Sequence, residues 1–335
     1  MLLAGSDDGV YRFDGLPAGA AEPTQVLESE RAFRVEQLPG LPGVFAATAS
    51  GLFHSPTGEA WTHLSIPTDA TVNSVGATVD GDRLFVGTFP ERLFVLEDAS
   101  AIFENEEHPS PQEWRESAGF REHAEAGDWG LPRHEFQAHV RSIEHHPDAP
   151  DSMFLGIEVG GVHVSDDRGE SWIARNEAAA ANEAAAGNDD VHELIVAGPE
   201  TFVAATGFGC FLSTDAGRSW TDLAADVEPQ YYRSATVYEG DVYAGGANGP
   251  SPTWPEDENP GLFVSPDGEG FEALDSPRPK EVVIGWAKVD GALVGVTHAG
   301  TLLRTENGEQ FEVVGEVPTG QEVQGRYLSL ARFEQ

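Results

Sequence analysis

Cationic and imidazole side chains recur at one register of several expected strands. Of the 19 basic residues only Lys280 and Lys288 are lysines, whereas 57 residues are acidic. Six expected inner strands can be aligned by an apolar residue of their alternating pattern: Val75, Ile143, Leu194, Ala235, Ala287 and Leu328. Two residues before these positions, in the same order, stand Asn73, Arg141, His192, Arg233, Gly285 and Arg326. Arginine forks bind carboxylates, phosphates and sulfates through paired hydrogen bonds. This register predicts an anion site, and the structural alternative is that these arginines pair with acidic neighbours from adjacent blades.

Residues in expected loops add to these candidates. Glu158 lies in the turn 156–161, and His298 lies in the turn before Gly300. In a seventh expected strand, Glu36 stands at the register described above. The ligand-binding candidates are Asn73, His139, Arg141, Glu158, His192, Arg233, His298 and Arg326. If the site is catalytic, its proton-transfer and nucleophilic groups are sought among Glu158, His192, Tyr231 and Tyr232. Strand alternation directs Glu193 away from His192, so these two are not expected to act together.

No metal and no cofactor is expected from the sequence. The run His145-His146-Pro147-Asp148 contains ligand types, but a turn between two strands explains it better and the ligand set is incomplete. The single cysteine, Cys210, excludes an intrachain disulfide framework.

Two octapeptides predict the elements that position these side chains. Both read S-x-D-x-G-x-x-W, at 165–172 and 213–220, and each follows a short apolar run. A strand ends at the Ser, the Asp accepts backbone N–H bonds, the Gly adopts a positive φ, and the Trp begins the next strand. Their structural residues are Ser165, Asp167, Gly169, Trp172, Ser213, Asp215, Gly217 and Trp220. Shorter copies occur at 55–61, 265–271 and 305–311.

Small residues mark seven equivalent hairpins along the chain. These residues are Gly5, Ala47, Gly87, Gly156, Ala205, Gly245 and Val296, at intervals of 42, 40, 69, 49, 40 and 51. Four-stranded propeller repeats need ~40–50 residues. The spacing therefore predicts an all-β fold, a seven-bladed β-propeller of four-stranded antiparallel blades forming a single domain over 1–335. An inserted loop is expected at about 99–139 and an expanded loop at 247–260.

The two ends of the chain are expected to share one blade. The last inner strand, at 326–333, has no hairpin after it, and the first hairpin, at 2–13, has no inner strand before it. Pairing the C-terminal strand with the N-terminal hairpin closes the ring and protects the sheet edges.

Two segments between the expected strands have helical sequence patterns. Ser110, Pro111 and Glu113 are typical of a helix start, with the Ser as cap and the Glu three residues later. The alternative, which we favour, is that Trp114 opens the outer strand of that blade. An alanine-rich helix is expected at 178–186.

Strand direction separates the turn motifs from the expected site. In a four-stranded blade, the turn between the third and outer strands lies on the face where the inner strand ends. A ligand site is expected at the opposite face, where the inner strands begin, as is common in propellers.

The chain resembles the WD40/YVTN/BNR-like (Asp-box) repeat proteins, many of which are labelled glycosyl hydrolases or sialidases. The resemblance covers the full length and rests on the two octapeptides and their shorter copies. The resemblance implies one of two functions. The first is a non-catalytic propeller that binds a small anion or a protein partner at the arginine-lined mouth of the channel. The alternative is a sialidase-like glycoside hydrolase or lyase that acts there on an anionic sugar or carboxylate.

Departures from the sialidase pattern leave the catalytic interpretation open. Arg141, Arg233 and Arg326 are similar to an arginine triad, and Tyr231 or Tyr232 to its nucleophile. However, residues 33–36 match the F/Y-R-I-P element of sialidases only in part, and sialidases have six blades rather than seven. Seven-bladed xyloglucanase-like enzymes use two such domains, and seven-bladed Asp-box proteins also include photosystem assembly factors that bind partners.

Composition predicts the partners and surroundings of the chain. The formal net charge is −38 and is spread over every repeat. With no basic stripe, nucleic-acid binding is not expected. No apolar stretch approaches the ~18 residues of a membrane span, and Met1 leads into an expected strand without a signal peptide. A cytoplasmic monomer is expected. The acidic, lysine-poor composition resembles that of haloarchaeal proteins, with an ordinary acidic protein as the alternative.

The charge predicts that folding depends on salt. At 1 M salt the Debye length is only ~3 Å, against ~10 Å at 0.1 M, so molar salt screens the repulsion among acidic side chains. We expect the melting temperature, followed by circular dichroism, to rise from dilute buffer to molar KCl, with partial unfolding in dilute buffer. An unchanged melting temperature would refute the halophilic interpretation.

Overall fold

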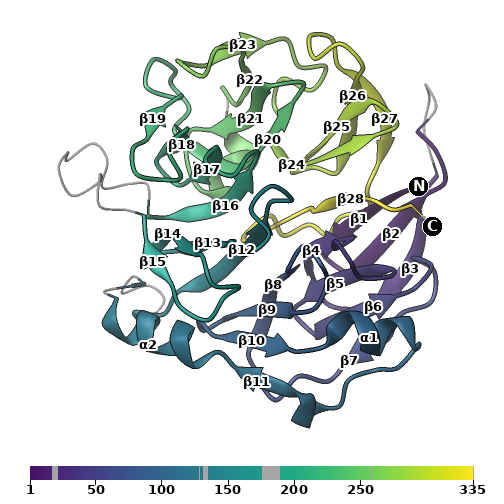
Figure 1. The fold of residues 1–335 in the computed structure, drawn as a ribbon. Coiled ribbons are helices and arrows are strands. Elements are labelled where there is room, and N and C mark those ends of the chain that lie inside the picture. Colours follow the sequence, from purple (N-terminus) through teal and green to yellow (C-terminus); the bar gives the residue numbers. More distant parts are fainter. Residues whose placement is uncertain (17–21, 128, 131–134, 176–188, 258, 335) are drawn as a thin grey trace.

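The structure is a ring of seven four-stranded antiparallel sheets around a central channel (Figure 1). It is a computed structural model that describes residues 1–16, 22–127, 129–130, 135–175, 189–257 and 259–334. The seven-bladed propeller predicted from the hairpin spacing is therefore confirmed. The expected helix at 178–186 and residues 131–134 of the inserted loop lie outside the described residues.

Each blade contributes one strand to the channel wall and three strands outside it. The inner strands are β4 (Ala32–Glu36), β8 (Thr71–Ala77), β12 (His139–His145), β16 (Val191–Val196), β20 (Tyr231–Tyr238), β24 (Val283–Val289) and β28 (Leu330–Arg332). The second strands are β5 (Val44–Thr48), β9 (Leu84–Phe89), β13 (Met153–Glu158), β17 (Phe202–Thr206), β21 (Asp241–Ala247), β25 (Ala292–Thr297) and β1 (Leu2–Ser6).

The outer half of each blade holds its third and outer strands. The third strands are β6 (Gly51–Ser55), β10 (Leu93–Leu96), β14 (Gly161–Ser165), β18 (Gly209–Ser213), β22 (Gly261–Ser265), β26 (Thr301–Thr305) and β2 (Gly9–Phe13). The outer strands are β7 (Thr62–Leu64), β11 (Trp114–Glu116), β15 (Ile173–Ala174), β19 (Thr221–Asp222), β23 (Glu272–Leu274), β27 (Glu312–Glu316) and β3 (Thr24–Glu28). Apolar clusters fill the space between neighbouring blades.

The ring closes as predicted, by pairing the two ends of the chain. Strand β28 pairs with β1, Leu2 opposite Arg332 and Ala4 opposite Leu330, in one sheet with β2 and β3. Figure 1 shows both termini at this blade. The regular strand is shorter than the expected 326–333, and Gly5 N–H still donates to the Ser329 carbonyl at 2.8 Å. Phe333 is 2% exposed and packs with Leu3 and Ala331 beneath this blade.

Hydrogen bonds in the two octapeptides explain their residue types. Ser165 Oγ accepts the N–H of Gly169 at 2.8 Å, and the Asp167 carboxylate accepts the N–H of Ser171 at 2.8 Å. Gly169 has φ 86°, a left-handed conformation that glycine adopts without steric cost. The second octapeptide repeats this pattern, with the Asp215 carboxylate accepting the N–H of Ser219 at 2.8 Å.

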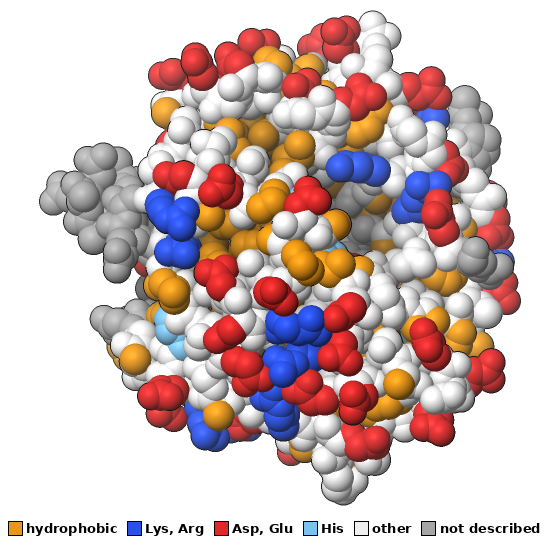
Figure 2. Space-filling model, in the orientation of Figure 1, with side chains coloured by type: hydrophobic (Ala, Val, Ile, Leu, Met, Phe, Trp, Pro, Cys, Tyr) orange, Lys and Arg blue, Asp and Glu red, His pale blue; other side chains and the backbone are white. Residues whose placement is uncertain are grey.

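These turns lie on the face where the inner strands end. Arg168 in the first turn donates to Asp80 at 2.9 Å, and Asp80 lies in the turn that follows β8. Arg83 and Arg115 extend this ion-pair network to Glu170 and Glu97. Figure 2 shows acidic side chains spread over one whole face of the molecule, with basic side chains between them. On this face the acidic side chains are therefore distributed rather than gathered in one patch.

The insertion after β10 combines both structures considered for it. Helix α1 (Ala99–Glu104) is followed by a 3-10 helix, η1 (Pro111–Glu113), and Ser110 and Glu113 form the predicted capping box, with the Ser110 N–H donating to Glu113 at 2.7 Å. Trp114 then opens β11, the outer strand. Helix α2 (Ala118–Ala126) follows. A 3-10 helix, η5 (Ser251–Glu256), occupies the expanded loop.

A β-bulge interrupts six of the inner strands near their beginnings. The register shifts at Phe33, Asn73, Arg141, His192, Ile284 and the pair Arg233–Ser234. A bulge adds one residue against the partner strand and turns side chains out of simple alternation. Alternation had predicted that Glu193 points away from His192, but both side chains line the channel.

Ring closure gives a stability prediction. Phe333→Ala removes a fully buried ring from the closing blade, and such truncations cost about 3–5 kcal/mol. We expect urea unfolding in molar KCl to show a loss of this size. Phe208→Ala is the matched control, because Phe208 is 61% exposed, and it should change the free energy of unfolding little. Equal losses in both variants would contradict the closing role of Phe333.

Candidate functional site

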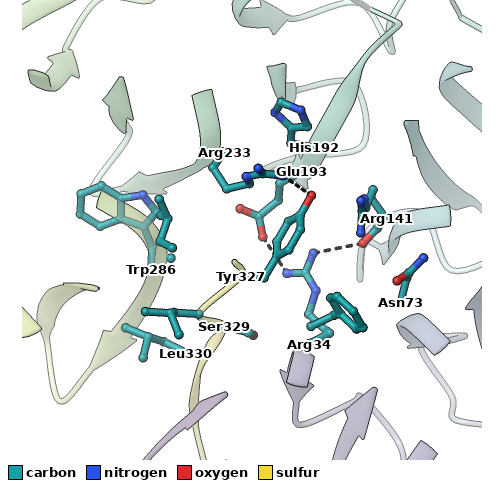
Figure 3. A pocket seen from close by; sticks show the side chains of 14 residues that line it. Arg34, Asn73, Arg141, His192, Glu193, Arg233, Trp286, Tyr327, Ser329 and Leu330 are labelled. Atoms are coloured by element: carbon teal, nitrogen blue, oxygen red, sulfur yellow. Dashed lines mark hydrogen bonds and ion pairs between the residues drawn. The ribbon is translucent and has the colours of Figure 1, made fainter. Parts of the chain in front are cut away.

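A funnel opens at the face where the inner strands begin. Its volume is about 870 Å³, and it narrows into a channel section of about 40 Å³. The bulged residues Phe33, Asn73, Arg141, His192 and Arg233 line both parts, so the bulges of five blades converge here. Figure 3 shows the narrow section, with the Tyr327 hydroxyl directed at Arg233.

Arg141 is paired within its own blade. Its Nε lies 2.6 Å from Glu158 Oε2, and each side chain is only 9% exposed. Burial would raise the pKa of Glu158, but the Arg141 guanidinium and the other positive charges around it hold that pKa well below its usual range. Glu158 therefore remains a carboxylate, and Arg141 forms an ion pair within its own blade rather than with an adjacent blade, as the structural alternative had it.

Arg233 is buried without such a pair. It is 5% exposed, and no described carboxylate lies within 4.0 Å of it. Its guanidinium carbon lies 4.5 Å from the ring centre of Tyr327, 5.4 Å from Tyr231 and 5.7 Å from Trp254. One Nη donates to the Tyr327 hydroxyl at 2.5 Å, and Nε has no hydrogen-bond partner among the described residues.

The aromatic rings hold this arginine but do not neutralise it. Cation–π contacts contribute about 0.5–2 kcal/mol, whereas an unpaired buried charge costs several kcal/mol. An arginine in this state gains more from an anion entering the funnel than a paired arginine does.

His192 lies beside Arg233 with one ring nitrogen fixed. Its Nδ1 is 2.7 Å from the Tyr232 carbonyl oxygen, and its ring centre is 4.7 Å from that of Tyr231. Its Nε2 is 3.9 Å from Asp190 Oδ1. Burial, followed by the charge of Arg233, lowers the pKa of His192.

The funnel wall also includes an amide–imidazole–phenyl contact. Asn73 Nδ2 lies 3.2 Å from His139 Nδ1, and the His139 ring stacks on Phe89 with centres 3.9 Å apart and planes 11° apart. Phe208, at the rim, is 61% exposed. The funnel thus presents charged groups in its depth and aromatic side chains around them.

An arginine lower in the channel has the opposite surroundings. Arg34 Nη1 binds Glu193 at 2.7 Å, with Glu36 and Glu144 nearby. Burial raises the pKa of Glu36 to about 7, although Arg34 acts in the other direction. This part of the channel has a surplus of carboxyl groups around Arg34, and that arginine is paired with Glu193.

The structure brings most of the predicted ligand-binding residues to the funnel. Those that line it are Asn73, His139, Arg141, Glu158, His192 and Arg233. Among the catalytic candidates Tyr231 also lines it, whereas Tyr232 is fully buried and donates its hydroxyl to the Pro229 carbonyl. His298 does not line it, because its ring is 6% exposed behind Trp254 and its Nδ1 accepts the Val282 N–H.

Arg326 also lies away from the funnel, contrary to the predicted register. It is 2% exposed, its Nε donates to Asp7 at 2.9 Å, and its Nη atoms donate to the carbonyls of His298, Gly320 and Glu322. Its neighbour Tyr327 occupies the channel instead. The register also differs in two other blades, where Ile284 and Phe33 stand at the bulge rather than Gly285 and Glu36.

Sequence reasoning missed several residues of the funnel. Asp190 precedes β16 by one residue and gave no periodic signal. Tyr327, Phe33, Phe89 and Phe208 also line it. The sequence carries a signal for two of them, since Phe33 and Tyr327 are directly adjacent to Arg34 and Arg326.

Comparison with known proteins supports the fold alone. No protein-family model and no curated protein matches the chain. Many solved propellers are similar in structure. YCF48 bound to D1 peptide is 15% identical with TM-score 0.57, and the match covers 90% of this chain and 85% of that one. The Cps50 (Swd1) β-propeller domain of Myceliophteria thermophila is 11% identical with TM-score 0.58, covering 92% and 88%.

An enzyme also appears among these similar structures. An ancestral GH74 enzyme is 13% identical with TM-score 0.57, and the match covers 90% of this chain but only 39% of the enzyme. The fold is thus of the WD40/YCF48 type. It is shared by YCF48, solved with a bound peptide, and by the GH74 enzyme, which is more than twice as long as the part of it that matches. Among the described residues, no helix is long and apolar enough to cross a membrane.

The position of Arg326 gives a second stability prediction. Arg326→Gln removes a buried cation that compensates Asp7 and three carbonyl groups, and breaking a buried pair costs about 3–5 kcal/mol. Arg218→Gln is the control, since Arg218 is exposed and donates only to the Asp215 carbonyl. Urea unfolding of both variants in molar KCl tests this. A loss below about 1 kcal/mol for Arg326→Gln would contradict the structural role.

Proposed function

We propose that this chain is a non-catalytic Asp-box propeller that binds an anionic group, carried by a small molecule or by a protein partner, at the mouth of its central channel. One observation carries the proposal: Arg233 is buried in the funnel with its Nε unpaired and with no described carboxylate within 4.0 Å. Arginine is the side chain best suited to carboxylate and phosphate groups, because its donors form a planar fork.

The shape and lining of the funnel support a ligand larger than an inorganic ion. About 870 Å³ accommodates a sugar acid or several peptide residues. The aromatic side chains Phe33, Phe89, Phe208 and Tyr231 offer apolar contact around the charged depth. The similarity to YCF48 bound to D1 peptide favours a peptide over a sugar, as an argument from fold.

The turn chemistry supports the Asp-box assignment. The carboxylates of Asp167 and Asp215 accept equivalent N–H bonds, and Gly169 and Gly217 both have positive φ. Because these turns lie at the far face, they take no part in the proposed binding.

A glycoside hydrolase or lyase at the same face is the second candidate. The similarity to a GH74 enzyme and the proximity of the Glu158 and Asp190 carboxylates favour it. A retaining glycosidase needs two carboxyl groups about 5–5.5 Å apart, one of them protonated at neutral pH. The ion pair of Glu158 with Arg141 keeps that carboxyl ionised, which makes it a poor acid and favours the binding function.

Removal of Arg233 tests the binding function. The probes are glucuronate, inorganic phosphate, and acidic tetrapeptides with a free or an amidated C-terminus, each measured by thermal shift and calorimetry at one fixed KCl concentration. We expect at least one probe to stabilise the native chain. Arg233→Gln should weaken that probe by roughly 10–100-fold, because hydrogen bonds to charged groups contribute about 1.5–3 kcal/mol.

The control and the peptide pair separate the possible outcomes. Arg218→Gln removes an exposed arginine at the opposite face and should bind the probe as the native chain does. Binding that is lost on C-terminal amidation identifies a terminal carboxylate as the recognised group. If no probe binds, or if Arg233→Gln binds equally well, the proposal fails. Release of a product from the probe would instead support the hydrolase.

A further inference from the structure

Three metal-ligating side chains converge on one wall of the funnel. They are Glu158 at the end of β13, Asp190 just before β16, and His192 within β16, and one ligand atom of each lies within 4.8 Å of the others. All three are buried, at 7%, 6% and 2% exposure. Two carboxylates with an imidazole are donors that first-row divalent cations accept.

The orientation of the His192 ring is a second, independent observation that points to a ligand at Nε2. Its Nδ1 lies 2.7 Å from the Tyr232 carbonyl, which only accepts, so Nδ1 must carry the proton. In the neutral ring Nε2 then presents a lone pair to the funnel. Asp190 Oδ1 lies 3.9 Å from this Nε2, which is beyond hydrogen-bonding distance, and it is itself an acceptor. A ring held by Nδ1–H to a carbonyl, with Nε2 free, has the orientation of a metal-bound histidine.

The backbone beside the cluster leaves room for the Asp190 carboxylate. A Cβ at Gly207 would lie 2.4 Å from Asp190 Oδ2 and 3.6 Å from His192 Cε1, so a larger residue would displace the carboxylate. Glu158 also retains capacity as a ligand. Arg141 binds one of its oxygens, and a carboxylate has about four lone-pair sites on two oxygens.

We propose that Glu158, Asp190 and His192 form a binding site for a first-row divalent metal ion such as Zn²⁺ or Mn²⁺. Zinc lies about 2.0–2.2 Å from nitrogen and oxygen ligands, which places neighbouring ligands ~3–4 Å apart. Small side-chain rotations suffice to close the observed spacing to this value. Three protein ligands leave one or more coordination positions open toward the funnel.

The charges of the funnel are compatible with a bound cation. Arg141 pairs with Glu158, and Asp190 adds a second carboxylate to the cluster, so a divalent ion meets two carboxylates there. An anion in the funnel would then be attracted by the metal and by Arg233 together. Metal binding does not depend on the proposed function, because the three ligands are present without any anion.

Metal titration of the full-length, untagged chain tests the site. The protein is treated with EDTA, transferred to metal-free KCl buffer, and titrated with ZnCl₂ and MnCl₂ by calorimetry and with CoCl₂ by visible absorption. We expect saturable binding of one equivalent and cobalt bands typical of nitrogen and oxygen ligands. Asp190→Asn and His192→Gln should each weaken binding by more than about tenfold, since loss of an outer-shell partner alone costs that much.

Matched controls keep the result interpretable. Asp189→Asn makes the same change one residue away, at a side chain outside the cluster, and His145→Gln changes a histidine of another part of the blade. Both should bind as the native chain does, and the melting temperature of each metal-free variant shows that it folds. Arg233→Gln should retain metal binding, which separates this site from the anion site.

Two results would overturn the proposal. One is the absence of saturable heat and of cobalt bands with the native chain. The other is undiminished binding by Asp190→Asn and His192→Gln, which would show that the ion binds elsewhere. Failure of every anionic probe in EDTA, with metal binding intact, would count against the anion site alone.

Discussion

Closure of the ring by β28 and β1 is the constraint on which the rest of the structure depends. Every inner strand packs between two neighbours, so an open ring would leave the strands of the first and last blades without a neighbour on one side. The segment that closes the ring also builds the site. Three residues separate Arg326, which pairs with Asp7, from the start of β28. One of them, Tyr327, lines the channel and accepts a hydrogen bond from Arg233. Stability and the geometry of the funnel are therefore coupled through one short stretch of chain.

The bulges convert a repeated structural strand into a site with different residues in each blade. Without a bulge, alternation would give each inner strand one channel-facing residue in every two. The extra residue lets His192 and Glu193 both reach the channel, at different depths, where one faces Asp190 and the other binds Arg34. The fold thus separates a funnel with an unpaired arginine from a lower section with surplus carboxyl groups.

The sequence was sufficient for the fold but only for part of the site. Two octapeptides and the spacing of small residues predicted the blade count and the closure, because turn chemistry and strand period are local properties. The register placed Asn73, Arg141, His192 and Arg233 at the funnel, since regular strands flank them. It failed near Arg326, where residues 326–329 form no regular strand, and it could not reveal Asp190, whose relation to Glu158 exists only after two blades pack together. Whether Arg141 and Arg233 are paired also depended on contacts that no local pattern records.

The pairing of arginines is more informative than their number in a chain with 57 acidic residues. With carboxylates in such excess, an arginine finds an ion-pair partner almost anywhere on the surface, as Arg83, Arg115 and Arg168 do. Two arginines are buried in the part of the chain that the structure describes, and of these Arg326 has Asp7, whereas no described carboxylate pairs with Arg233. The cost of burying a lone charge is not offset by its aromatic neighbours, and a structural role would be served equally by a neutral side chain. The proposed anion site would supply the partner that no described carboxylate gives to Arg233.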